Sequence, residues 1–295
     1  MAALLQIIGL EKSYGRVNAV NGVSFSVEQG ICFGILGPNG AGKTTTIEII
    51  EDVIPPTAGE ILYKGKSRSA SFREEVGIQF QNTALFSFLT VRETLLTFKN
   101  LYNHTHDIDE LIELCSLSGF IDQMNDKISG GQKQRFTLAL SLINKPELIF
   151  LDEPSTGLDP QSRRNLWDVI RAIKKTGKTI ILTTHYMEEA QILCDEVAIM
   201  DHGKIIAQGS PEQLIKNLSM DISVLLPKDH VDAERLKTLP LNFVDSFDQI
   251  RIKTSDINAC LETLISARIN LKDMVVRSPN LETVFLNLTG RQLRE

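Results

Sequence analysis

One octapeptide constrains this chain more than any other feature: Gly37-Pro38-Asn39-Gly40-Ala41-Gly42-Lys43-Thr44. It matches the pattern G-x-x-x-x-G-K-[ST], a loop whose backbone N–H groups surround phosphate oxygens. Residues 31–36 before it are apolar, as in a buried strand, and residues 45–50 after it resemble the opening of a helix. Strand, glycine-rich turn and helix is the setting that such a loop requires. The sequence therefore predicts a nucleotide-phosphate site, against the alternative of a glycine-rich surface turn.

The parts of this loop have separate expected roles. Glycines let the backbone turn its N–H groups toward phosphate, and the helix that follows directs its positive end at the same anion. Lys43 can reach the β- and γ-phosphates, and the Thr44 hydroxyl can bind magnesium. We expect residues 37–44, together with Thr45, to hold the nucleotide.

The composition argues against several classes of protein. The chain has 295 residues with an ordinary globular balance, 42% hydrophobic and 23% charged. No apolar run approaches the ~18–20 residues that cross a bilayer, and the first residues lack a signal-peptide pattern. The formal net charge of −6 argues against a nucleic-acid partner. The four cysteines are scattered, so we expect buried thiols in a reducing compartment.

The pattern up to about residue 218 predicts an α/β domain, because short β-rich runs alternate with helical segments. The apolar runs 148–151 and 180–182 favour strands buried on both faces of a parallel sheet. From about 88 to 145 only helical patterns occur, which predicts a helical insertion. The expected strands are 22–28, 31–36, 60–63, 147–151, 179–184, 197–200 and 205–207, the last two as a hairpin, and the helices of the insertion are 91–101, 108–117 and 132–143.

The remainder, 219–295, predicts a second, small domain. Its pattern runs strand, helix, strand, strand, helix, strand, which is the ferredoxin-like order. The expected strands are 222–226, 243–245, 249–253 and 271–276, and the helices are 231–239 and 257–267. One more helix is expected after these, with Ser278 as its cap and Pro279 at its first position.

Two acids follow the buried run 148–151. A phosphate-loop enzyme places a magnesium-binding carboxylate at the end of such a strand, and Asp152 fits that position. Glu153 comes one residue later and can face the γ-phosphate and polarise a water molecule. The alternative, a strand that merely ends in polar residues, would be preferred if the phosphate loop were absent.

The stretch Ser129-Gly130-Gly131-Gln132 is the second decisive motif. Ser129 can open a helix, and the glycine pair leaves the N–H groups of the first turn uncovered, which together make an anion site. A capped helix after a loop would explain Ser129, but we expect it not to explain the glycine pair followed by Gln132.

With Ser-Gly-Gly-Gln placed between the phosphate loop and Asp152-Glu153, the chain resembles the nucleotide-binding subunit of an ABC transporter over about residues 4–215. The resemblance implies an α/β fold. It would combine a P-loop NTPase (RecA-like) core with an antiparallel β subdomain and a helical signature subdomain. Residues 219–295 would then form a small C-terminal α+β domain with an accessory role.

The resemblance also implies roles for single residues. Tyr14 would stack on adenine, and Gln81 would touch magnesium and the attacking water. His185 would contact the γ-phosphate, and Asp159 belongs to a loop that crosses to the partner subunit. The cofactors implied are ATP and Mg²⁺, and the activity implied is ATP hydrolysis.

The implied partners are a second copy of the chain, or a related ATPase subunit, and an integral-membrane permease on a separate chain. The protein would then be cytoplasmic and bound to the inner face of the membrane through that permease. The stretches 156–160, 183–190 and 281–290 look like those of bacterial export ATPases, which serve drugs, polysaccharides, lipids or natural products. An importer subunit and non-transport ABC ATPases remain alternatives. The apolar cluster Leu85, Phe86 and Phe88 is expected to face the permease.

Overall fold

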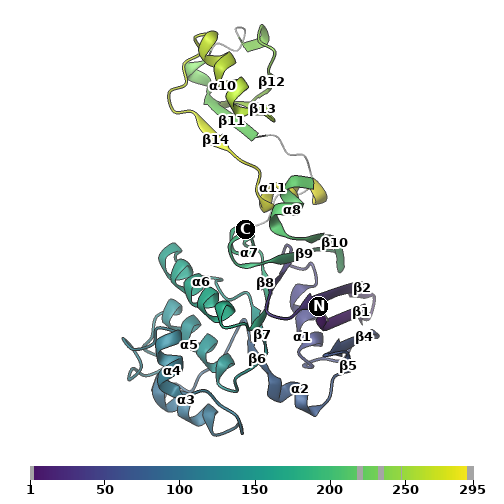
Figure 1. Ribbon diagram of the computed structural model, residues 1–295, viewed down its shortest axis with the longest axis vertical. Coiled ribbons are helices and arrows are strands. Elements are labelled where there is room, and N and C mark those ends of the chain that lie inside the picture. The colour runs from purple at the N-terminus through teal and green to yellow at the C-terminus, as the bar shows by residue number, and fades with distance from the viewer. Residues whose placement is uncertain (1–2, 218–221, 232–235, 247, 291–295) are drawn as a thin grey trace. The chain divides into compact units, whose positions relative to one another are not determined.

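The computed structural model of the protein describes residues 3–217, 222–231, 236–246 and 248–290 (Figure 1). The chain divides into two compact units, the first reaching to Pro211 and the second beginning at Glu212. In the described part of the chain, no helix combines the length and the apolarity needed to cross a membrane.

A six-stranded sheet forms the centre of the first unit. Its strand order is β10-β9-β3-β8-β7-β6, in which all neighbouring pairs are parallel except β9 and β10. Every residue of β3, β7 and β8 is buried, as expected for strands covered on both faces. The strands are β3 (Cys32–Leu36), β6 (Val76–Gln79), β7 (Leu148–Asp152), β8 (Thr179–Thr184), β9 (Glu196–Asp201) and β10 (Lys204–Gly209).

This parallel register decides where the polar residues gather. The carboxyl ends of parallel strands meet at one edge of a sheet. Here the phosphate loop follows β3, and Gln81 follows β6 by two residues. Asp152 ends β7, and His185 directly follows β8. The topology therefore brings four predicted site segments to the same edge.

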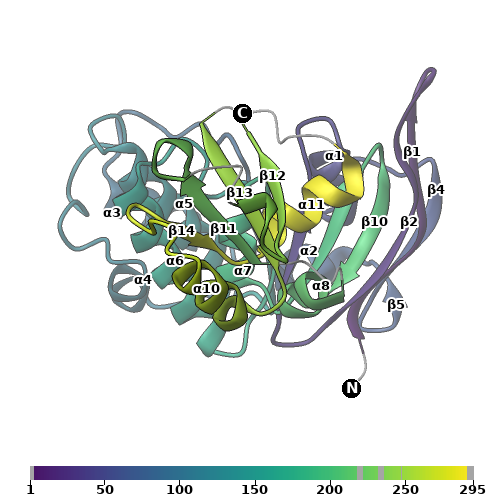
Figure 2. The same cartoon turned by 90° about the horizontal axis from the view of Figure 1, so that it is seen from above.

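A second, antiparallel sheet packs its apolar face against the central sheet. Its order is β2-β1-β4-β5, and the rings of Phe25 and Phe33 stack at 4.9 Å within the common core. Figure 2 shows β1, β2 and β4 along one side of the unit, next to β10. The strands are β1 (Ala3–Tyr14), β2 (Val17–Glu28), β4 (Ala58–Tyr63) and β5 (Lys66–Ser67). The sequence analysis did not identify β1, β5 or β6.

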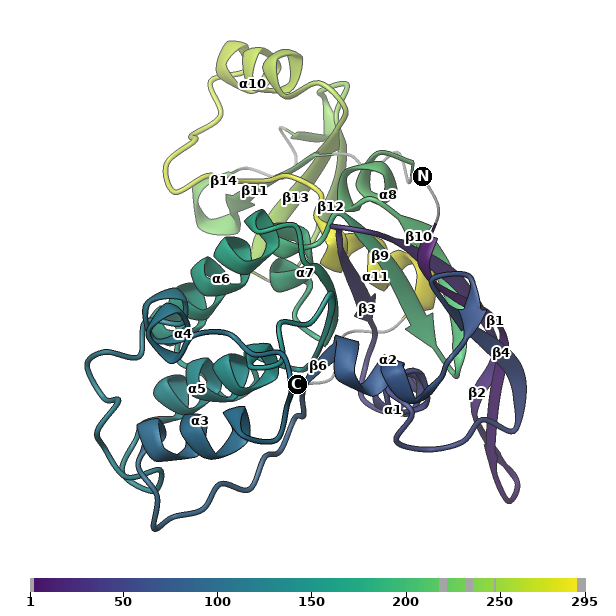
Figure 3. The same ribbon diagram turned by 60° about the horizontal axis from the view of Figure 1, so that its bottom comes forward.

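Three helices of the first unit that follow one another along the chain also lie side by side (Figure 3). Between β6 and β7 lie α3 (Val91–Lys99), α4 (Ile108–Leu114) and α5 (Gly130–Leu142), with no named strand among the described residues there. Capping explains two of their starts, because the side chains of Thr90 and Asp107 accept backbone N–H groups of α3 and α4. The other helices are α1 (Lys43–Ile50), α2 (Ala70–Glu75), α6 (Pro160–Lys175) and α7 (Met187–Leu193).

The second unit contains a four-stranded antiparallel sheet of order β12-β13-β11-β14. This strand order, with a helix before the last strand, is that of a split β-α-β arrangement. Buried side chains of α10, Cys260 and Leu264, pack on the sheet. The elements are α8 (Pro211–Asn217), β11 (Ile222–Pro227), a 3₁₀ turn (Lys228–His230), β12 (Asn242–Asp245), β13 (Gln249–Thr254), α10 (Ile257–Ser266), β14 (Val275–Arg277) and α11 (Leu281–Thr289).

Two details of this unit differ from the expectation. Helix α11 is capped by Asn280 rather than by Ser278, because the Asn280 side chain accepts the backbone N–H of Thr283 at 2.9 Å and closes a capping box. The last strand starts at Val275 rather than at residue 271. The helix expected at 231–239 lies partly outside the described residues.

Candidate active site

The phosphate loop depends on glycine at two positions. A Cβ atom at Gly37 would lie 2.3 Å from the Met200 carbonyl oxygen, and one at Gly42 would lie 2.3 Å from the Ala19 carbonyl oxygen. Gly42 also has φ of 99°, a left-handed conformation that favours glycine. It precedes α1 without a side-chain cap. The first N–H groups of α1 are therefore left for another acceptor, as an anion site requires.

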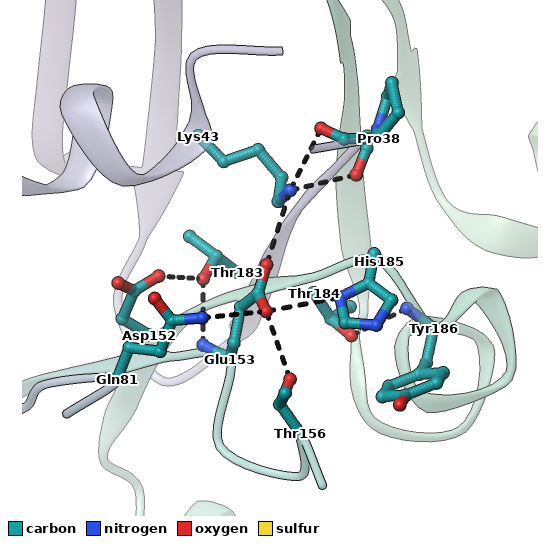
Figure 4. Close-up of polar contacts among 11 residues, drawn as sticks. Pro38, Lys43, Gln81, Asp152, Glu153, Thr156, Thr183, Thr184, His185 and Tyr186 are labelled. Atoms are coloured by element: carbon teal, nitrogen blue, oxygen red, sulfur yellow. Dashed lines mark hydrogen bonds and ion pairs between the residues drawn. The ribbon is translucent and has the colours of Figure 1, made fainter. Parts of the chain in front are cut away.

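Lys43 lies at the centre of this loop and is buried. Its Nζ donates to the carbonyl oxygens of Gly37 at 2.9 Å and Pro38 at 3.2 Å. It also lies 3.5 Å from Oε1 of Glu153 (Figure 4). Burial lowers the pKa of Lys43, and the carboxylates of Glu153 and Asp152 oppose that shift. The phosphate loop and the acid pair thus form one buried cluster.

Glu153 is the residue on which this cluster converges. Its backbone has φ of 46° and donates to the Thr183 hydroxyl at 3.0 Å, which holds the turn after β7. Its Oε2 accepts from Gln81 Nε2 at 3.2 Å and from the Thr156 hydroxyl at 3.1 Å. Nδ1 of His185 lies 3.2 Å from the same oxygen, in a contact whose angle is not that of a hydrogen bond. The structure thus brings all three predicted catalytic residues together (Figure 4).

The charges around Glu153 keep it ionised. The His185 ring lowers the pKa of Glu153 most. Burial opposes that shift and the Lys43 ammonium adds to it, and the net effect lowers the pKa of Glu153 to about 2. At neutral pH the side chain is therefore a carboxylate that can accept hydrogen bonds but not donate them.

Asp152 and Thr44 form the predicted magnesium position. Burial raises the pKa of Asp152, while the hydroxyls of Thr183 and Thr44 stabilise its ionised form. The Thr183 hydroxyl donates to Oδ1 of Asp152. A carboxylate and a hydroxyl side by side are oxygen ligands of the kind that magnesium prefers. The residues present therefore fit such an ion, and Gln81 contributes a nearby amide.

Beneath His185 lies a buried acid that the sequence analysis missed. Glu189 on α7 accepts from Trp167 Nε1 on α6 at 2.9 Å. Burial raises the pKa of Glu189, and the hydroxyls of Thr184 and Ser155 oppose that shift. Through its bond to Trp167, this acid ties α7, which follows His185 in the chain, to α6.

An aromatic contact supports the loop that carries His185. The ring of Tyr186 lies 4.2 Å from the ring of His185, and the Arg163 guanidinium lies 4.3 Å from the Tyr186 ring.

The predicted site did not include Thr183, Thr156 or Glu189. The polar pair Thr183-Thr184 at the end of an apolar strand is the same signal that identified Asp152, so the sequence did contain it.

The turn Ser129–Gln132 at the start of α5, which we call the signature turn, differs from this cluster. Ser129 Oγ accepts the N–H of Gln132 at 3.3 Å, and Gln132 Oε1 accepts the N–H of Ser129 at 2.7 Å. This capping box accounts for Gln132 without a ligand, so the expectation that a capped helix would not explain it is wrong. A Cβ at Gly131 would lie 2.7 Å from Ser162 Oγ, whereas one at Gly130 would lie 3.9 Å from Leu158 Cδ2, an ordinary van der Waals contact.

Two other predicted residues lie outside the cluster of contacts around Glu153. Tyr14, at the end of β1, is 52% exposed, with the Lys12 ammonium 5.2 Å from its ring. Asp159 caps α6 by accepting the N–H groups of Gln161 and Ser162 at 3.0 and 2.9 Å, contacts that contribute to a lowered pKa. Its carboxylate therefore stabilises its own helix.

Comparisons with known proteins extend these observations. A family model described as ABC transporter matches residues 20–156. The chain is 36% identical over 311 residues to the linearmycin resistance ATP-binding protein LnrL of Bacillus subtilis (strain 168), covering 99% of this chain and all of that protein (100%). It is 39% identical over 308 residues to the Nod factor export ATP-binding protein I of Ralstonia nicotianae, covering 99% and 95%. These similarities span both units of the chain.

Among solved structures, the chain resembles an ATP-binding cassette of an ABC transporter in its ADP conformation. The TM-score is 0.67 at 25% identity, covering 74% of this chain and 94% of that one.

Proposed function

Because the chain belongs to the ABC transporter family as an ATP-hydrolysing, ATP-binding subunit, we propose that the cluster around Glu153 is one half of a hydrolysis site shared by two subunits. The observation that carries this proposal is the convergence of Lys43, Gln81 and His185 on one carboxylate, at 3.5, 3.2 and 3.2 Å. These side chains come from four separate segments, so the arrangement is built by the fold and not by one local motif.

Glu153 orients the water that attacks the γ-phosphate. A carboxylate with a pKa near 2 is a weak proton acceptor, because general bases work best near the operating pH. Lys43 and His185 cause much of that low value. When they turn toward phosphate oxygens, the pKa of Glu153 rises and the carboxylate becomes a better base. Nucleotide binding and activation of the base are therefore linked through the same charges.

Asp152 and Thr44 would hold a magnesium ion, with the Gln81 amide close by. Such an ion would supply positive charge to offset that of the nucleotide's phosphates. The buried Thr183 hydroxyl keeps the Asp152 carboxylate ionised and oriented for this role.

The second half of the site comes from another subunit. Ser129 and Gly130 are exposed, and among the described residues no hydrogen bond joins them to Lys43 or Glu153. In a pair of subunits, the signature turn of one would cover the nucleotide held by the phosphate loop of the other, with the loop around Asp159 crossing between them. Tyr14 would hold the adenine from the same subunit as Lys43. The partner is a second copy or a related ATPase subunit.

The chain drives export through a separate permease at the inner face of the membrane. The names of the relatives refer to linearmycin resistance and to Nod factor export. Phe86 and Phe88 are 54% and 70% exposed, and their rings lie 5.6 Å apart. An exposed aromatic pair of this kind marks a protein interface, and we assign it, with Leu85, to permease docking.

Phosphate release by the purified full chain with ATP and magnesium tests this function. Glu153→Gln should lower the rate at least ~10²-fold while a fluorescent ATP analogue still binds. Glu113→Gln, which changes an exposed acid on α4, is the matched control and should keep the wild-type rate. A normal rate in Glu153→Gln would remove Glu153 from the reaction.

A further inference from the structure

A cavity of about 500 Å³ lies where the end of α1, strand β6 and helices α3 and α5 meet. Neither Lys43 nor the acids of the cluster around Glu153 line it, so it is separate from the hydrolysis site. Its lining includes Glu51 at the end of α1 and Gln79 at the end of β6. Residues 80 and 83 also line it, and the same segment continues to the exposed Phe86 and Phe88.

Two hydrogen-bond acceptors in this lining have no donor. Glu51 is 4% exposed and Gln79 is 1% exposed, and Oε1 of each has no hydrogen-bond partner among the described residues. The orientation of the Gln79 amide is fixed, because its Nε2 donates to Gln134 Oε1 at 2.6 Å and to the Thr137 hydroxyl at 3.0 Å. Buried polar atoms are nearly always paired, so two unpaired acceptors in one cavity indicate a missing donor.

Arg73 and Asp52 also line this cavity, and they pair with each other there. Arg73 Nη2 lies 2.8 Å from Oδ2 of Asp52, and Arg68 Nη2 lies 3.4 Å from Oδ1 of the same residue. Arg68 also donates to the carbonyl oxygen of Ile50. Burial, with the charges of Asp152 and Glu48, raises the pKa of Glu51 to about 8. An incoming cation would relieve this unfavourable environment.

The walls of the cavity narrow the choice of cation. Three aromatic residues line it, Phe80, Phe98 and Tyr102. A guanidinium is planar, carries five N–H donors and stacks on aromatic rings, whereas an ammonium has three donors and no flat face. The composition of this lining, two side chains with an unpaired acceptor and three aromatic rings, therefore suits a guanidinium better than an ammonium.

We propose that this cavity receives an arginine side chain from the docking segment of the permease, with Glu51 as its counter-charge and Gln79 as its second acceptor. The assignment of the arginine to the permease rests on the proposed function. The affinity of the cavity for a guanidinium does not depend on it, because the unpaired acceptors belong to this chain.

The first experiment probes the cavity without the permease. Thermal unfolding of the purified full chain is measured with N-acetyl-arginine amide and with the neutral, nearly isosteric N-acetyl-citrulline amide. The arginine probe should raise the Tm of the wild type more than the citrulline probe does. Glu51→Gln should lose this difference, and Glu113→Gln should keep it. Equal responses in wild type and Glu51→Gln would overturn the proposal.

The same variant separates a ligand site from a structural acid. The pKa of Glu51 is 4.5 in the unfolded chain and about 8 in the folded protein. Glu51 therefore destabilises the fold increasingly as the pH rises from 4.5 to about 8. Glu51→Gln removes this destabilisation, so at pH 7 its Tm should exceed that of the wild type. A lower Tm would mean that Glu51 holds the fold together, which contradicts the proposal.

The second experiment brings in the permease. The tagged full chain is purified from native membranes, and the multi-span membrane protein that accompanies it is identified and quantified. Glu51→Gln removes a charge-assisted contact, so recovery of the membrane protein should fall by about 10-fold or more. Binding of the ATP analogue should stay unchanged. Unchanged recovery would overturn the assignment of the arginine to the permease. If no such membrane protein accompanies the wild type, the permease proposal itself fails, and the arginine probe still decides the chemistry of the cavity.

Discussion

The two anion-binding motifs of this chain differ in how complete they are. In the cluster around Glu153, Lys43 and Glu153 are buried and lie 3.5 Å apart, and Gln81 and His185 of the same subunit contact the same carboxylate. In the signature turn, Ser129 and Gly130 are exposed, and a capping box joins Ser129 to Gln132. One motif is thus organised by the sheet edge, and the other is a rigid surface element. The difference is what the proposal of a shared site requires, in which the second motif acts on a nucleotide held by another subunit.

The largest expected effect tests whether the two motifs act in different subunits. Lys43→Ala and Ser129→Arg should each lower ATP hydrolysis more than ~10²-fold, because each removes several kcal/mol of charge or donor contacts to phosphate. In a mixed pair, one site carries both lesions and the other none. ATP-dependent dimerisation should therefore return when the two variants are mixed. Size-exclusion chromatography measures the dimer. If dimerisation is absent at every mixing ratio, both motifs serve one nucleotide within one chain.

The next effect tests how strongly the charges around Glu153 stabilise the fold. Its pKa falls from 4.5 unfolded to about 2 folded, so its contribution is present above pH 4.5 and is lost as the pH falls toward 2. Glu153→Gln should therefore lower the free energy of unfolding by about 2–3 kcal/mol at pH 7. The two proteins should converge near pH 2 in denaturant titrations. A difference that does not change with pH would mean that the carboxylate is not held by its neighbours.

The glycine pair of the signature turn offers a matched comparison of packing and binding. Gly131→Ala should cost about 2 kcal/mol, because its Cβ meets Ser162 and α6 must shift. Gly130→Ala makes only an ordinary van der Waals contact, with Leu158 at 3.9 Å, and should leave the free energy of unfolding within about 0.5 kcal/mol of wild type. It should nevertheless weaken ATP-dependent dimerisation if its N–H faces a nucleotide. Equal stability of the two variants would contradict the close contact between α5 and α6.

The smallest effect concerns the base of the nucleotide. Tyr14→Ala should weaken ATP binding by about 1 kcal/mol, the lower end of the range for base–aromatic stacking, because the ring is half exposed. The maximal hydrolysis rate should stay near that of the wild type. The apparent KM for ATP measures this, and Tyr14→Phe, which keeps the ring, serves as the control. An unchanged KM in Tyr14→Ala would leave Tyr14 as an ordinary surface residue.

The sequence predicted best where a motif fixes the backbone directly. The phosphate loop and the strand ending in Asp152 follow from glycine spacing and a continuous apolar run, so their elements and neighbours could be derived. Strand β1 was missed because its register against β2 shifts near Gly9, which interrupts the alternation of apolar and polar residues. Strand β6 was missed because it has four residues, too few for a periodic pattern.

Tertiary burial is what the sequence did not reveal. Glu188 and Glu189 are adjacent and chemically identical, yet Glu188 is exposed and Glu189 is fully buried against Trp167. Which of the two acids faces α6 depends on how α7 packs, and no local pattern decides it. Gln132 shows the converse, since a purely local rule, the capping box, explains a residue that had been assigned to a ligand.

The hydrogen bond between Trp167 and Glu189 has a consequence for spectroscopy. Trp167 is the one tryptophan in the chain, so its intrinsic fluorescence reports on a single place, the contact between α6 and α7 under the loop that carries His185. The indole is buried beside a carboxyl group, and its emission therefore depends on the polarity and charge next to it. A spectral change on adding ATP would time the movement of this loop in the unmodified protein, without a dye or a label.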